Sequence, residues 1–326
     1  MQVTLAAGER FDLHQTEEEI GDCTGLIQVK PSTCRACTLN GISSDRATMC
    51  ELFAMSARFP ADVRFSLEAF SRRGGLAGRH KDGWGIAYYA DEDVRLVKEP
   101  QPAAGSACLH FIQDHPFSSA TVLSHIRRAT RGAPAMKNCQ PFQRELGGRV
   151  HVFAHNGDLD LDALRGRMRL ESFHPVGDTD SEHAFCALLE RLRGPWLRGG
   201  VPPLEERRSL VARFAAEIRA LGPANFIYSD GDAMFIHGHK RFHDDGVAPH
   251  PPGLHLLCRH CAGEARAMTA EGLSVALGPE QEVVLAASVP LTEEPAWRAL
   301  DEGELVAVQR GRIVAGAPAA QADFPR

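Results

Sequence analysis

The sequence predicts an α+β fold in which two β-sheets pack together and helices lie outside them. Two groups of apolar, strand-like segments flank a middle region with helical periodicity. The chain has 326 residues, 44% of them hydrophobic, so a sizeable core can form. We find no internal repeat, and we interpret 194–203 as a loop within one domain.

The first group of strands alternates with turn signals and one helical segment. Residues 64–73 have the apolar spacing of a short helix that Gly74-Gly75 would end. An Asp-Gly pair at Asp82 leads into an apolar strand that forms a hairpin with the next one. The strands predicted in this group are Cys50–Ala57, Trp84–Tyr89, Val94–Val97, Ala120–Ile126 and Arg149–Ala154.

The apolar pattern in the middle of the chain predicts two amphipathic helices, which are followed by strands. The first helix opens at Thr179, which has capping-box spacing to Glu182. The second runs from about Leu204 to Leu221 and is ended by Gly222-Pro223. The later strands are predicted at Asn225–Ser229, Ala233–His237, Gly253–Cys258, Val283–Ser288 and Glu304–Val308.

Composition excludes several classes of protein. The net charge is −6, and no basic stripe interleaved with aromatic residues points to nucleic acid. No apolar run reaches the roughly 18 residues of a membrane helix, and the start lacks a secretory signal. Nine irregularly spaced cysteines favour reduced thiols, and therefore the cytoplasm. We expect no cofactor.

Residues 1–49 differ from the rest because they show no sustained period of 2 or 3.6. We predict that they are a misassigned start or a removed leader, and that residues 50–326 form the working domain. Cys50 would then be residue one. Its thiol is a nucleophile, and its α-amine, with a reference pKa of about 7.7–8.0, can act as its base. The alternative is a buried cysteine in a first strand.

Further candidates for amide chemistry lie at strand ends. Asn156 and Gly157 can offer a side-chain N–H and a backbone N–H to a tetrahedral oxyanion, although Asn-Gly is also a common hairpin turn. Arg127 can hold a carboxylate with its planar guanidinium, or it can simply leave a strand for solvent. Asp180 can pair with an ammonium group while it also serves the first turn of a helix.

Five short motifs occur in order, and together they are specific. They are Met49-Cys-Glu-Leu52, His80-Lys-Asp-Gly-Trp-Gly85, His125-Ile-Arg-Arg-Ala-Thr130, His155-Asn-Gly157 and Gly177-Asp-Thr-Asp-Ser-Glu182. Through them the chain resembles the small stand-alone class-II glutamine amidotransferases of the YafJ-like type, which are N-terminal-nucleophile hydrolases. The resemblance covers residues 49 to about 315.

This resemblance implies a four-layer αββα sandwich and a glutaminase-type amidohydrolase that forms a γ-glutamyl thioester. The implied catalytic residues are Cys50, Asn156 and Gly157, and the implied substrate-binding residues are Arg127, Thr130 and Asp180. The substrate would be glutamine or a γ-glutamyl compound, and a separate enzyme could accept the ammonia. The sequence departs from wider class-II patterns at Arg128, Arg131 and Cys139-Gln-Pro141, and these departures concern the shape of the glutamine pocket.

Other functions remain open from sequence. Cys34, Cys37, Cys258 and Cys261 could form a four-thiolate zinc site in a binding module. His237 and His239 share a strand face near His243 and could also suggest a metal, although we favour a solvated hairpin that carries these histidines. A further alternative is a non-catalytic regulatory or partner subunit that keeps the fold.

Overall fold

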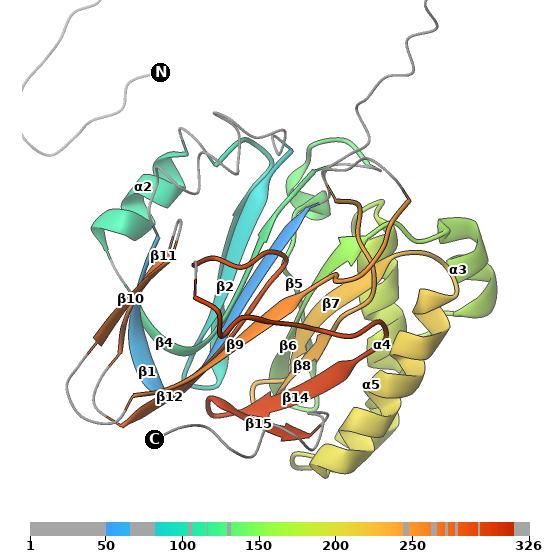
Figure 1. Cartoon of the computed structure of the whole chain (residues 1–326). Helices are drawn as coiled ribbons and strands as arrows, with labels where there is room; N and C mark the ends of the chain where they lie inside the picture. Colours follow the sequence, from blue (N-terminus) through green and yellow to red (C-terminus); the bar gives the residue numbers. More distant parts are fainter. Residues whose placement is uncertain are drawn as a thin grey trace, which may run out of the picture. The chain divides into compact units, whose positions relative to one another are not determined.

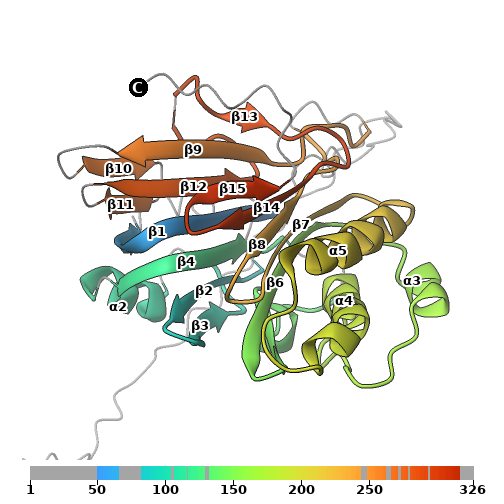
Figure 2. The same cartoon turned by 90° about the horizontal axis from the view of Figure 1, so that it is seen from below.

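Two antiparallel sheets lie face to face with helices outside them in the computed structural model (Figures 1 and 2). The structure describes residues 50–65, 82–103, 106–115, 117–128, 132–243, 248–261, 266–270, 273–277, 280–292 and 294–315. All of these lie in one compact unit, Ser43–Arg326. This arrangement of helix, sheet, sheet and helix confirms the predicted four-layer fold.

The first sheet is built around β1, which runs from Glu51 to Phe65. In the described residues this sheet has nine strands in the order β13-β9-β12-β1-β4-β2-β3, with β11 also paired to β1 and β10 to β11. The other strands are β2 (Trp84–Ala90), β3 (Asp93–Glu99), β4 (Phe117–Ile126), β9 (His255–Cys261), β10 (Arg266–Ala270), β11 (Leu273–Leu277), β12 (Gln281–Ala287) and β13 (Arg298–Ala299).

The second sheet carries the strand that ends at Asn156 and Gly157. Its six strands in the described residues have the order β15-β14-β8-β7-β6-β5. Their bounds are β5 (Phe142–Leu146), β6 (Arg149–Gly157), β7 (Ala224–Ser229), β8 (Met234–His237), β14 (Leu305–Gln309) and β15 (Arg312–Ala315).

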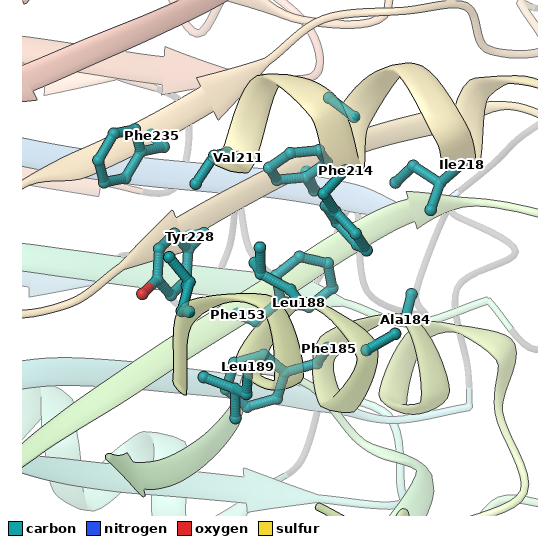
Figure 3. Packing of buried hydrophobic residues seen from close by; sticks show 14 of the residues in the cluster. Phe153, Ala184, Phe185, Leu188, Leu189, Val211, Phe214, Ile218, Tyr228 and Phe235 are labelled. Carbon is teal, nitrogen blue, oxygen red and sulfur yellow. The ribbon is translucent and has the colours of Figure 1, made fainter. Parts of the chain in front are cut away.

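Helices cover the outer face of each sheet. Helices α3 (Leu161–Arg167), α4 (Asp180–Trp196) and α5 (Leu204–Arg219) pack on the second sheet, and α2 (Ala107–Asp114) packs on the first (Figure 2). Figure 3 shows the side chains of α4 and α5 that meet the second sheet. Phe153 of β6 stacks on Phe185 of α4 with ring centroids 5.3 Å apart.

Strand β1 is apolar on both faces because a separate core lies on each side of it. Leu52 and Ala54 face the core between the sheets, whereas Met55 and Ala57 face the core under α2. Successive strand residues point to opposite faces, so a strand buried on both sides reads as a continuous apolar run. The sequence therefore signals the strand clearly without telling which residue faces which layer.

The predicted strands and the two long helices are present, whereas strands β5, β10, β11, β13 and β15 and helices α2 and α3 were not predicted. Residues 64 and 65 belong to β1, where the prediction began a helix at Arg64, and the remainder of that predicted helix lies outside the described residues. The β1–β4 register shifts between Ser56 and Ala61, around Pro60. Proline interrupts a strand pattern in sequence, although a bulge can accommodate it.

A buried ion-pair group joins α5 to the β7–β8 turn. Arg207 is 2% exposed, and its guanidinium donates to Asp230 at 2.7 Å and to Asp232 at 2.6 Å. Asp230 has no exposed side-chain surface. Removing one partner of such a pair leaves a buried charge uncompensated.

We expect Arg207→Ala to lower the free energy of unfolding by about 3–5 kcal/mol, because the Asp230 carboxylate then stays buried without its cationic partner. The neighbouring Arg208 pairs with Glu205 at the surface and supplies the matched control, Arg208→Ala. Urea unfolding followed by circular dichroism measures both variants. Equal stability of the two variants would contradict this account.

Candidate active site

Cys50 lies directly before β1, next to the chain that leaves β4. Glu51 pairs with Ile126, which brings Cys50 beside Arg127 and Arg128. The Cys50 thiol donates to the Arg128 carbonyl oxygen and accepts from the Arg128 N–H, with both distances 3.1 Å. The residue as a whole is half-buried, and its thiol is held by main-chain groups of a neighbouring segment.

Burial dominates the chemistry of this thiol. Loss of solvent raises the pKa of Cys50 to about 11, although the Arg128 backbone hydrogen bond and the charge of Arg127 lower it, and the charge of Asp180 adds to the rise. A cysteine thiol with such a pKa is almost entirely protonated at neutral pH. The register of β1 with β4 places Arg127 next to this segment, and Ser181, which follows Asp180, lies with its Oγ 2.9 Å from His155 Nδ1 beside Asn156.

Arg127 is held inside the protein. Its side chain is 4% exposed, so the interpretation of an arginine leaving a strand for solvent is wrong. Its guanidinium donates to the carbonyl oxygens of Asp82 at 3.2 Å and Gly132 at 2.9 Å. Its own N–H donates to the Gly83 carbonyl oxygen at 2.8 Å. The Asp82-Gly83 motif thus fixes the arginine from one side.

Asn156 comes from the other sheet and meets Cys50. Strand β6 continues through Asn156 and Gly157, which pair with Asn225 and Ala224 of β7. The hairpin-turn interpretation of Asn156-Gly157 is therefore wrong. The Asn156 side chain is fully buried, and its Nδ2 donates to the Cys50 carbonyl oxygen and, at 3.2 Å, to Ser288 Oγ.

Gly157 lies where no side chain fits. A Cβ built there would be 1.9 Å from the Pro223 carbonyl oxygen and 2.5 Å from His155 Nε2. The segment before it is also clamped, because the Gln140 amide donates to the His155 carbonyl oxygen at 3.1 Å and accepts from the His155 N–H at 2.7 Å. These contacts fix the path of the main chain at the end of β6.

Asp180 begins α4, and Thr179 caps that helix. Thr179 Oγ1 accepts from the Glu182 N–H at 3.2 Å, as the capping box predicts. The second hydrogen bond of a capping box, from the Thr179 N–H to the Glu182 carboxylate, is absent among the described contacts. The Glu182 carboxylate instead accepts from the Val176 N–H and the Gly177 N–H. Asp180 Oδ2 accepts from the Leu159 N–H at 2.8 Å, which orients the carboxylate.

The structure thus brings five of the six predicted site residues into one region. These are Cys50, Arg127, Asn156, Gly157 and Asp180. Thr130 lies outside the described residues, as does Arg131. Of the other departures from the family pattern, Cys139 is fully buried, and Gln140 forms the clamp on His155.

The described residues contain no set of side chains that would support a metal site. Among them, no three His, Cys, Asp or Glu side chains come together in a way that could hold a metal ion. His237 and His239 are both buried, so the interpretation of these two histidines as solvated is wrong. His237 contacts the Glu304 carbonyl oxygen, and His239 contacts Glu302. Cys34 and Cys37 lie outside the described residues. None of the described helices has both the length and the apolar character needed to cross a membrane.

Sequence reasoning missed residues that support the site through hydrogen bonds. Gln140, Asn225 and Ser288 are all buried and all contact the Asn156 segment or its neighbours. Asn225 Nδ2 donates to the Asn156 carbonyl oxygen at 3.0 Å. The signal that could have found them is a polar residue inside or beside an apolar strand, since buried polar groups are normally hydrogen-bonded.

Comparisons with known proteins identify the family of the chain. Residues 49–324 match the family model of class-II glutamine amidotransferases. The chain is 36% identical to YafJ of Escherichia coli (strain K12), a protein named as a candidate glutamine amidotransferase, over 78% of this chain and 96% of YafJ. A similarly named relative from Haemophilus influenzae is 31% identical over 82% of this chain and 86% of the relative.

A solved structure gives the same result. The crystal structure titled as a predicted glutamine amidotransferase from Pseudomonas aeruginosa PA01 is 34% identical, with a TM-score of 0.62, over 82% of this chain and all of that chain. The match of the family model, the identity to YafJ and the shared fold lead to one conclusion: the chain belongs to the class-II glutamine amidotransferases, and it is of the stand-alone YafJ-like type.

Proposed function

We propose that Cys50, exposed as the first residue after loss of residues 1–49, attacks the γ-carboxamide of glutamine or the γ-amide of a γ-glutamyl compound. Family membership supports the coarser activity, which is glutamine amide hydrolysis or transfer of its nitrogen. The observation that carries the finer proposal is the meeting of the two sheets, where the Asn156 amide contacts the Cys50 main chain. Arg127 and Asp180 act on the same thiol.

The proposed reaction begins with a proton transfer. The Cys50 thiol gives its proton to its own α-amine, and the thiolate adds to the substrate carbonyl carbon. The resulting oxyanion accepts from an Asn156 side-chain N–H and from the Gly157 backbone N–H. The C–N bond then breaks, the leaving nitrogen takes the proton from the ammonium, and a γ-glutamyl thioester remains. Water adds to the thioester and releases glutamate and the thiol.

Burial of the thiol explains why the free amine matters in this proposal. While residues precede Cys50, its nitrogen is an amide and cannot take a proton. A thiol whose pKa is about 11 then lacks a base on its own residue. An α-amine with a reference pKa of about 7.7–8.0 supplies one near neutral pH. Processing would therefore create the catalytic base.

Substrate recognition in this proposal uses both charges near the thiol. Arg127 binds the α-carboxylate and Asp180 binds the α-ammonium, with Thr130 lining the pocket. Arg127 is already oriented by the main-chain carbonyl oxygens of Asp82 and Gly132, which reduces the entropy lost on binding. Two charges of opposite sign select an amino-acid backbone over a simple amide.

The proposal includes two fates for the released nitrogen. Either a separate enzyme uses the ammonia that glutamine releases, or the protein hydrolyses a γ-glutamyl compound, so that water takes the γ-glutamyl group and the amine is released. We place the reaction in the cytoplasm because nine irregularly spaced cysteines favour reduced thiols. The competing proposal, a partner subunit without catalysis, differs in having no glutaminase activity.

We expect Cys50→Ala to abolish glutamate formation from L-glutamine while the protein stays folded, because the thiol forms the covalent bond. Cys108→Ala is the matched control, since Cys108 is exposed on α2. Both variants are assayed after intact mass has shown that the parent chain begins at Cys50. Turnover by Cys50→Ala at the parent rate would end the proposal.

The pH dependence of Cys50 alkylation tests the link between burial and processing. In chains that retain residues before Cys50, the pKa of about 11 means that thiolate is scarce at pH 8 and increases with pH. Iodoacetamide labelling of Cys50, read by peptide mass spectrometry, should therefore accelerate about tenfold per pH unit between pH 8 and 10. A rate that levels off below pH 9 would contradict the raised pKa.

A further inference from the structure

Ser288 lies where the two sheets meet beside Cys50. It directly follows β12, which pairs with β1, and its side chain is 2% exposed. The Ser288 N–H donates to the Leu52 carbonyl oxygen at 3.0 Å. The strand that carries Cys50 therefore holds the Ser288 main chain.

The Ser288 hydroxyl joins this strand to the opposite sheet. Its oxygen accepts from the Leu52 N–H at 2.9 Å and from Asn156 Nδ2 at 3.2 Å. A serine hydroxyl oxygen accepts two hydrogen bonds, so both of its acceptor positions are used. One buried hydroxyl thus contacts both Leu52, two residues after Cys50, and Asn156, which we expect to hold the oxyanion.

The Ser288 main chain is also held from a third direction. An Arg241 guanidinium N–H donates to the Ser288 carbonyl oxygen at 2.8 Å. Arg241 is itself buried and pairs with His250 through main-chain hydrogen bonds in both directions. The Ser288 main chain is therefore held at both its N–H and its carbonyl oxygen.

The hydrogen bonds of Asn156 show why this acceptor matters. A side-chain amide has two N–H donors, and those of Asn156 go to the Cys50 carbonyl oxygen and to Ser288 Oγ. Asn156 Oδ1 is buried and has no hydrogen-bond partner among the described residues. The orientation of the amide therefore depends on the two acceptors of its nitrogen.

We propose that Ser288 is a positioning residue that keeps the Asn156 N–H directed at the oxyanion. This inference rests on the proposed function. When substrate arrives, one Asn156 N–H leaves the Cys50 carbonyl oxygen for the oxyanion, and the other stays on Ser288 Oγ. Without that hydroxyl, the amide loses its remaining acceptor and can rotate its oxygen toward the negative charge.

Loss of the Ser288 hydroxyl should lower kcat and leave KM nearly unchanged. The oxyanion exists only in the transition state and the tetrahedral intermediate, so a badly oriented Asn156 weakens only the binding of those species. We expect Ser288→Ala to lower kcat for L-glutamine by about tenfold, the size of one neutral hydrogen bond, with KM changed by less than about twofold. Asn156→Ala should lower kcat by roughly 10²–10³-fold.

A double-mutant cycle separates positioning from general damage. If Ser288 acts through Asn156, adding Ser288→Ala to Asn156→Ala should change kcat by less than about twofold. Ser56→Ala is the matched control, because Ser56 is a buried serine of β1 whose hydroxyl accepts from the Gly311 N–H. It should keep the parent kcat. If Ser288→Ala does not fold, Ser288→Cys replaces it in the experiment. The cysteine side chain is similar in size to serine but is a weaker hydrogen-bond acceptor, so we expect a kcat between those of the parent and of a variant without the acceptor.

Each outcome has one meaning. An unchanged kcat in Ser288→Ala, or the same tenfold loss with and without Asn156, overturns the positioning role. A loss that appears in KM alone also overturns it. These results leave the proposed function intact as long as Cys50→Ala is inactive, whereas an active Cys50→Ala removes the proposed function itself.

Discussion

The pairing of β1 with both β4 and β12 is the constraint on which the candidate site depends. Its register with β4 brings the Cys50 thiol to the main chain of Arg128. Its register with β12 brings Ser288 to the main chain of Leu52. Cys50, directly before β1, therefore has the arginine segment on one side and the serine on the other. A slip of one residue would turn every β1 side chain to the other layer.

The second sheet and one helix complete this arrangement. Strand β6 brings the Asn156 amide across to the Cys50 main chain, and α4 brings Asp180 close enough to affect the thiol. The site therefore exists only when the two sheets pack together, which requires the core between them. Burial has a chemical consequence as well, because it raises the pKa of Cys50, and the proposed reaction therefore uses a base on the same residue.

Sequence reasoning predicted the layers and most candidate residues because strong local signals carry them. Continuous apolar runs predicted β1, β4 and β12, and polar motifs at strand ends predicted Arg127 and Asn156. It failed where only tertiary structure decides. Asn156-Gly157 looks like a turn until β7 pairs with it. A serine at the end of an apolar strand signals that Ser288 is buried and hydrogen-bonded, but its partners lie far away in the chain, so the sequence does not tell which residues it contacts.

Intact mass of the protein expressed from its own gene, before and after treatment with a glutamine-mimicking diazoketone, tests the central claim most directly. The account predicts a chain that begins at Cys50 and gains one covalent adduct, and it predicts that this adduct is located on Cys50 by peptide mapping. A chain that begins at Cys50 and gains no adduct, or an adduct on another residue, would contradict Cys50 as the nucleophile. A chain that keeps residues before Cys50 and still turns over glutamine would contradict the need for its free amine.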